Sequence, residues 1–195
     1  MMRDVRPWTY AALFGALWGA LEATLGTAVH LGKMPMRGAV MGLVGLFCLL
    51  CLRRLQPVPG VCLLAGVVAI FLKVFTLGGL YPGPIIGIAV QSLAVEAAMT
   101  LSGGRSFGAA IGGAVALATN PVQRLSMMWL VAGPEGVGAY LGLIRDGAAA
   151  VGLRGMEPRG IVGGMVMANA LLGAFGGLWA WRVAGRVCHR VGERR

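Results

Sequence analysis

Charged side chains are scarce in this sequence. Asp, Glu, Lys and Arg together make up 12% of its 195 residues, whereas soluble domains usually carry about 25%. Hydrophobic residues account for 57% of the chain, and its mean hydropathy is +0.79. A chain of this composition is expected in a lipid bilayer. We therefore predict an integral membrane protein in which residues 1–195 form a single transmembrane helical domain.

The sequence also lacks the motifs of nucleotide hydrolysis and of common hydrolases. It contains only two lysines, and neither lies in a G-x-x-x-x-G-K-[ST] phosphate loop. No G-x-S-x-G or H-E-x-x-H motif occurs. Only two histidines are present, and the C-x-x-C pair Cys48 and Cys51 has no further ligands at zinc spacing. We therefore expect no enzyme activity, no ATPase activity of its own, no metal site and no cofactor.

Apolar stretches long enough to cross a bilayer, roughly 20 residues each, occur about six times. They predict an all-α bundle of about six transmembrane helices. Asn120-Pro121 interrupts the fifth stretch, which either kinks and continues to about residue 133 or ends there. Residues 134–159 carry too many charges to span, so we expect an external loop, in which the stretch GVGAYLGLIRDGAAAV (136–151) can form a short interfacial helix. The predicted spans are 8–29, 38–52, 60–77, 84–101, a fifth from about 106, and 160–182.

Basic residues outnumber acidic ones by 17 to 7, which gives a net charge of +10. They cluster at the ends of apolar stretches, where they act as orientation signals, so we expect no nucleic-acid partner. With six spans, one face of the membrane receives ten of them and the other face five. Because the more basic face is cytoplasmic, we expect both termini in the cytoplasm and a multi-pass location in the plasma (inner) membrane. The ten are Arg3, Arg6, Arg53, Arg54, Arg105, Arg182, Arg186, Arg190, Arg194 and Arg195; the five are Lys33, Arg37, Arg145, Arg154 and Arg159.

Polar side chains interrupt the apolar stretches at one common depth. With a rise of about 1.5 Å per residue, Glu22 and Lys73 both lie about 20 Å above the inner ends of their helices. Gln91 falls at nearly the same level, and Asn120 and Asn169 lie within about a turn of it. A charge at the centre of a membrane helix costs at least about 2.5 kcal/mol. We therefore expect these side chains to face inward and Glu22 to pair with Lys73.

Two interpretations of this polar layer remain open. It is either a structural salt bridge that fixes helix packing, or the lining of a ligand cavity open to the outside. We favour the cavity, because ionisable residues inside membranes usually serve function. On this interpretation, the residues that contact the ligand are Glu22, His30, Lys73, Gln91, Asn120, Arg124 and Asn169.

Small residues recur every four positions along the first stretch, in two parallel stripes. One stripe is Ala11, Gly15, Gly19 and Ala23, and the other is Ala12, Ala16, Ala20 and Thr24. Such stripes permit close contact between helices. One stripe can pack inside the bundle while the other contacts a partner protein.

Four segments, LWGALEATLGTAVH, KMPMRG, LKVFTLGG and GPIIGIAVQSLAVE, resemble the substrate-binding (S) components of energy-coupling factor (ECF) transporters, in particular poorly characterised members of that group. The similarity covers about residues 10–102, half of the chain. It implies a six-helix protein that captures a small micronutrient, such as a vitamin or its precursor. In this family the ligand lies in the outer half, under the loops that join helices 1–2, 3–4 and 5–6.

The same resemblance implies partners. S components carry no ATPase; they dock onto a transmembrane coupling protein that two ATPase subunits drive. The small-residue stripe of the first helix contacts the coupling protein in that family. The matching residues here are Ala12, Ala16 and Ala20 or the neighbouring Ala11, Gly15 and Gly19. The chain departs from the family pattern at Gln91, where an acidic residue is expected, so no ligand chemistry is carried over to that position.

Two other function classes fit the same residues. A structural or assembly subunit of a larger membrane complex would use the small-residue stripes equally well. An ion-coupled carrier or channel would use Glu22, Lys73 and Glu96 as a proton relay.

Overall fold

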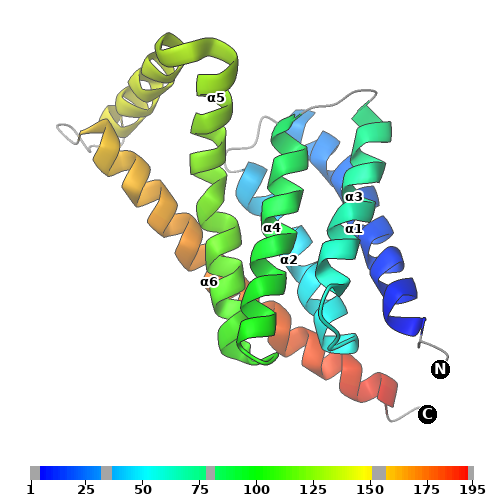
Figure 1. The fold of residues 1–195 in the computed structure, drawn as a ribbon. Coiled ribbons are helices and arrows are strands. Elements are labelled where there is room, and N and C mark those ends of the chain that lie inside the picture. Colours follow the sequence, from blue (N-terminus) through cyan, green and yellow to red (C-terminus); the bar gives the residue numbers. More distant parts are fainter. Residues whose placement is uncertain (1–4, 32–36, 78–81, 151–156, 193–195) are drawn as a thin grey trace.

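A computed structural model describes residues 5–31, 37–77, 82–150 and 157–192. These residues form six helices and no strand, so the described part of the chain is all-helical as expected. The helices, shown in Figure 1, are α1 (Arg6–Leu31), α2 (Arg37–Leu55), α3 (Val61–Leu77), α4 (Pro82–Leu101), α5 (Ser106–Ala150) and α6 (Pro158–Gly192).

Four of the described helices, α2, α4, α5 and α6, are long and apolar enough to cross a membrane. This property is consistent with a membrane protein, as the composition predicted. α3 is apolar but has only 17 residues. α1 has 26 residues and is not among these four.

Of the two alternatives for the fifth stretch, the structure shows the one in which the helix continues past Pro121 to about residue 133. It continues through Pro121 and changes direction at Gly133, whose φ of 66° and ψ of −167° are not helical. Glycine adopts such a positive φ without a steric penalty, and Pro134 then begins a new helical segment, because the first turn needs no donor from its nitrogen. Residues 134–150 are therefore helical, which agrees with the short helix expected at 136–151, while residues 151–156 lie outside the described residues.

The other five helices are arranged around α2. Within the described residues α2 contacts all five other helices, whereas α1 contacts only α2 and α3. The second segment of α5 and the first half of α6 extend away from the remaining helices (Figure 1). α1 begins and α6 ends at the same end of the bundle, which we call the terminal end (Figure 1). The other end, where α5 turns at Gly133, is called the distal end.

Glycines set the crossing of α5 and α6. Gly113 and Gly173 face each other so closely that a methyl group on either would collide with the carbonyl oxygen of the other. A methyl group on Gly177 would likewise collide with the carbonyl oxygen of Ala109. Because the obstacle in each case is backbone rather than a movable side chain, the two helices can approach this closely only at glycine.

Trp18 marks the centre of the core. It is fully buried, and a methyl group on Gly45 would lie 2.6 Å from its indole ring. Leu46, Leu49 and Leu50 of α2 belong to the same buried cluster. α1 thus inserts one large aromatic side chain against the glycine surface of α2, and this contact orients α1 relative to the rest of the bundle.

We predict that Gly173→Ala destabilises the protein by about 1–3 kcal/mol, since overpacking a close contact costs that much. Thermal unfolding in detergent or nanodiscs measures the effect. Gly163→Ala on the same helix is the matched control, because a methyl group there meets nothing within 4 Å. Equal midpoints for the two variants would contradict the glycine-mediated crossing.

Candidate functional site

Glu22 and Lys73 form a buried ion pair between α1 and α3. Lys73 Nζ lies 3.0 Å from Glu22 Oε2 and donates a second hydrogen bond to the Glu22 backbone carbonyl at 3.1 Å. Only 11% of the Lys73 side chain and 13% of the Glu22 side chain are exposed. The predicted pairing is therefore present. Because both charges lie away from solvent, each neutralises a group that would otherwise be costly in an apolar environment.

Two glycines of α1 lie beside the pair and face α3. A methyl group on Gly26 would lie 3.6 Å from Lys73 Nζ, and one on Gly19 would lie 2.8 Å from Leu72 Cδ1. α1 and α3 thus approach closely on both sides of the salt bridge. Met41 of α2 reaches the same place, with its methyl 3.9 Å from the position of a Gly26 methyl.

Gln91 and Asn120 bond to α2 rather than to the ion pair. Gln91 Nε2 donates to the Gly42 carbonyl at 2.6 Å, and Asn120 Nδ2 donates to the Gly38 carbonyl at 3.1 Å. Helix carbonyls can accept a second hydrogen bond, and at glycine no side chain shields them. α4 and α5 are in this way tied to one face of α2, because Gly38 and Gly42 are four residues apart.

The remaining predicted ligand contacts lie apart from this cluster. Asn169 is buried, and its Nδ2 donates at 2.9 Å to the Met165 carbonyl of its own helix. The guanidinium of Arg124 stacks over the ring of Tyr140 at 5.2 Å, in the segment of α5 beyond Gly133. His30 falls in the last turn of α1, and its side chain lies outside the described residues.

Within the described residues, members of the predicted layer therefore form separate pairings. Glu22 and Lys73 meet on one side of α2, while Gln91 and Asn120 bond to another of its faces. Gln123 of α5 adds one more tie, since its amide donates to the Gly83 carbonyl of α4. Every one of these amides bonds to backbone. These bonds fit the structural interpretation of the layer, and ligand contact by its residues stays a prediction.

A cavity of about 830 Å³ lies instead at the distal end, between the two segments of α5 and the start of α6. Its lining is largely apolar, and Ser126 and Arg159 supply the polar groups. It includes none of the residues predicted to contact a ligand. The lining residues are Leu125, Ser126, Met127, Trp129, Leu130, Val137, Leu141, Arg159 and Val162.

A second buried ion pair joins Arg53 of α2 to Glu96 of α4 at 3.4 Å. Thr100 accepts from Arg53 at 3.0 Å and donates to Glu96 at 2.9 Å, and the Cys62 amide donates to Glu96 at 3.0 Å. The sequence reasoning missed this network, because Arg53 was counted as an orientation signal. The available clue was that Arg53 and Glu96 lie near helix ends on the same side of the membrane.

The two small-residue stripes of α1 face different neighbours. Ala11 is fully buried, and methyl groups on Gly15 and Gly19 would lie 2.6 Å from the Ala65 carbonyl oxygen and 2.8 Å from Leu72 Cδ1 of α3. This stripe is occupied by packing within the bundle. Ala12 and Ala20 are exposed and Ala16 is partly exposed, so the stripe accessible from outside is theirs.

Comparison of the chain with known protein families, with curated proteins and with solved structures finds no match. Within the described residues, no group of three or more His, Cys, Asp or Glu side chains gathers in a way that could hold a metal ion.

We predict that Glu22→Gln and Lys73→Met are each strongly destabilising, by about 3–5 kcal/mol, because each leaves one buried charge without its partner. The double variant should lose much less free energy of unfolding than the two single variants lose together, since no unpaired charge remains. Thermal or denaturant unfolding of the four proteins in one double-mutant cycle measures the coupling. Purely additive losses would show that the two side chains do not stabilise each other.

Proposed function

We propose that this chain is the substrate-capture subunit of an ECF-type importer. It would bind a small micronutrient, such as a vitamin or its precursor, from outside the cell and rely on separate coupling and ATPase subunits for transport. Its six helices would all lie in the plasma membrane, with both termini in the cytoplasm. The basic terminal end, with Arg53, Arg54 and Arg105, supports this orientation.

One observation carries the proposal: α1 presents a face that no other described helix covers. Ala12, Ala16 and Ala20 run along it, and the Thr24 hydroxyl bonds to the Ala20 carbonyl at 2.9 Å. The polar group on this face is therefore already satisfied within the helix. A face of small residues lets a second membrane helix approach closely, which is what docking onto a coupling protein requires.

Exposed leucines border this face. Leu13 and Leu17 are 63% and 49% exposed, and they lie four residues apart on the same side of α1. Small residues and flanking leucines together form a groove and ridge that a partner helix can match. The neighbouring stripe of Gly15 and Gly19 supports the docking only indirectly, because it holds α1 against α3.

The distal cavity supports the capture of a ligand. Its volume of about 830 Å³ suits a vitamin-sized molecule, and its lining combines many apolar groups with few polar ones. Arg159 at this cavity would favour a ligand that carries a carboxylate or phosphate. The ligand would thus sit at the end of the bundle opposite Arg53 and Arg54.

A structural or assembly subunit of a larger membrane complex is the second candidate. It is favoured by one specific observation: Glu22, Lys73, Gln91 and Asn120 all bond to protein atoms and need no ligand. Such a subunit would use the exposed stripe of α1 for assembly but would capture no solute.

We predict that the chain copurifies with a transmembrane coupling protein when the two are expressed together, and that Ala16→Leu abolishes the complex. The added side chain would hold the partner helix away from α1. Ala89→Leu, at an exposed position on α4, is the matched control and should leave the complex intact. Retention of the complex by Ala16→Leu would contradict docking through this face.

Ligand capture is tested on the same preparations by thermal unfolding against a panel of vitamins and by mass spectrometry of copurified small molecules. The importer role predicts stabilisation by one compound of the panel. A flat response with docking through Ala16 intact would instead support the assembly role.

A further inference from the structure

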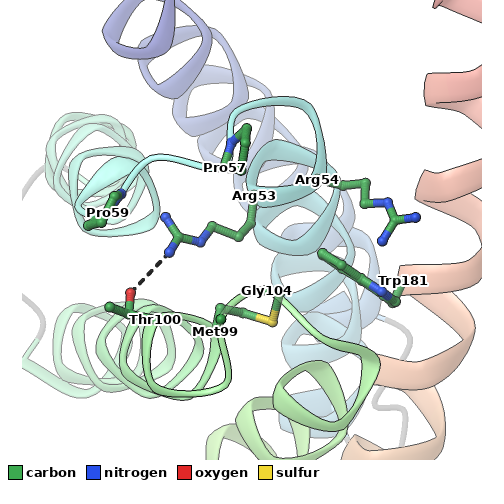
Figure 2. Close-up of a pocket in the computed structure, with 9 residues that line it drawn as sticks. Arg53, Arg54, Pro57, Pro59, Met99, Thr100, Gly104 and Trp181 are labelled. Carbon is green, nitrogen blue, oxygen red and sulfur yellow. Dashed lines mark hydrogen bonds between the residues drawn. The ribbon is translucent and has the colours of Figure 1, made fainter.

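A cleft of about 490 Å³ lies at the terminal end of the bundle, where α2 and α4 both end. It lies between these two helix ends, the turns that follow them and the second half of α6 (Figure 2). The cleft shares no lining residue with the distal cavity, and no residue of the exposed face of α1 lines it. The lining residues are Arg53, Arg54, Pro57, Pro59, Met99, Thr100, Gly103, Gly104 and Trp181.

Arg53 forms a fixed wall of this cleft. Its side chain is buried and points toward α4, where it bonds to Thr100 as Figure 2 shows. Its guanidinium also pairs with Glu96 and donates to the Val58 carbonyl. These bonds, made to α4 and to the turn before α3, hold the guanidinium in one position.

Arg54 supplies a cation that no acidic side chain neutralises within the described residues. It points away from Arg53 and toward α6, where its guanidinium carbon lies 4.4 Å from the centre of the Trp181 ring (Figure 2). Stacking on the indole holds the plane of the guanidinium and leaves its N–H edge available. An edge of this kind fits two oxygens of a phosphate at once.

The surrounding charge is strongly positive. Exposed arginines at the terminal end include Arg6, Arg105, Arg182 and Arg186. Among the described residues, Glu96 is the acidic side chain at this end, and Arg53 already neutralises it. An anion that enters the cleft therefore meets an attractive potential and no free carboxylate.

Apolar side chains supply part of the remaining lining, beside the Thr100 hydroxyl and the two glycines. Pro57 and Pro59 form one side of the cleft, and Met99 and the buried ring of Trp181 form another (Figure 2). A free inorganic phosphate would leave these groups without a contact. A phospholipid would contact these apolar groups through its glycerol backbone and first acyl carbons, while its phosphate contacted Arg54.

We propose that this cleft binds the phosphate of an anionic phospholipid, with Arg54 as the contact to the phosphate and the Arg53–Glu96 pair as a fixed, neutralised wall of the cleft. The bound lipid bridges the ends of α2, α4 and α6. This lipid site is separate from the distal cavity and from the exposed face of α1. The test of the lipid site is therefore independent of the test of the proposed transport function.

The experiment compares the protein in nanodiscs of phosphatidylcholine alone with nanodiscs that also contain phosphatidylglycerol, and measures lipid retention by native mass spectrometry. We expect the wild type to retain phosphatidylglycerol and to unfold at a higher temperature in its presence. Arg54→Gln should weaken retention about tenfold or more, as expected for a lost hydrogen bond to a charged group. Arg54→Lys keeps the charge but loses the planar fork, so its retention of phosphatidylglycerol should lie between that of the wild type and that of Arg54→Gln.

Arg186→Gln is the matched control, because it removes the same charge from the same end of the bundle but does not line the cleft. If Arg186 contributes only general attraction to an anionic surface, Arg186→Gln should weaken phosphatidylglycerol retention by at most about fivefold. Equal losses for Arg54→Gln and Arg186→Gln would overturn the site. Stabilisation by inorganic phosphate in phosphatidylcholine nanodiscs, with no effect of phosphatidylglycerol, would overturn the lipid as its source. Absence of any lipid preference would overturn the proposal too, and would leave an acidic side chain of a partner protein as the occupant to test.

Discussion

A polar group inside a membrane has to find its partner within the protein, because the lipid offers none. The charged side chains and most amides of this bundle satisfy that constraint through contacts between helices, whereas most hydroxyl groups and Asn169 bond within their own helix. Lys73 meets Glu22 across α1 and α3, and Arg53 meets Glu96 across α2 and α4. The amide of Gln91 bonds to the Gly42 carbonyl of α2. Each of these contacts fixes which helices are neighbours, whereas apolar packing alone would permit several arrangements.

Glycine makes these contacts possible. Gly42 offers an unshielded carbonyl to α4, and Gly45 leaves space for the Trp18 ring. Gly113 and Gly173 let α5 and α6 touch backbone to backbone. Among the described residues, Trp18 Nε1 is the buried polar side-chain atom left without a hydrogen-bond partner. Three features of the closely packed bundle take no part in these contacts: the outer face of α1, the distal cavity and the basic cleft. The proposals for a partner, a solute and a lipid follow from these three features.

Hydropathy and polar depth predicted much of this arrangement. The apolar stretches gave most helix boundaries to within a few residues, and the shared depth of Glu22 and Lys73 predicted their ion pair. Three features were beyond reach for physical reasons. The backbone angles of Gly133, which turn α5 back, depend on tertiary packing. Arg53 looked like a solvent-exposed orientation signal until α4 brought Glu96 to it. The acceptors of Gln91 and Asn120 are backbone carbonyls, which every residue carries and no sequence pattern marks.

The central claim is that the charges at positions 22 and 73 neutralise each other inside the bundle. Because the chain has only two lysines, Lys33 and Lys73, selective 15N labelling of lysine and 13C labelling of the glutamate carboxyl makes solid-state NMR in bilayers decisive. Lys33→Arg leaves Lys73 Nζ as the one labelled amine. The 3.0 Å distance from Nζ to Glu22 Oε2 predicts a strong dipolar coupling that Glu22→Gln abolishes. A labelled amine that shows no carboxyl coupling in the protein with Glu22 intact would contradict the account.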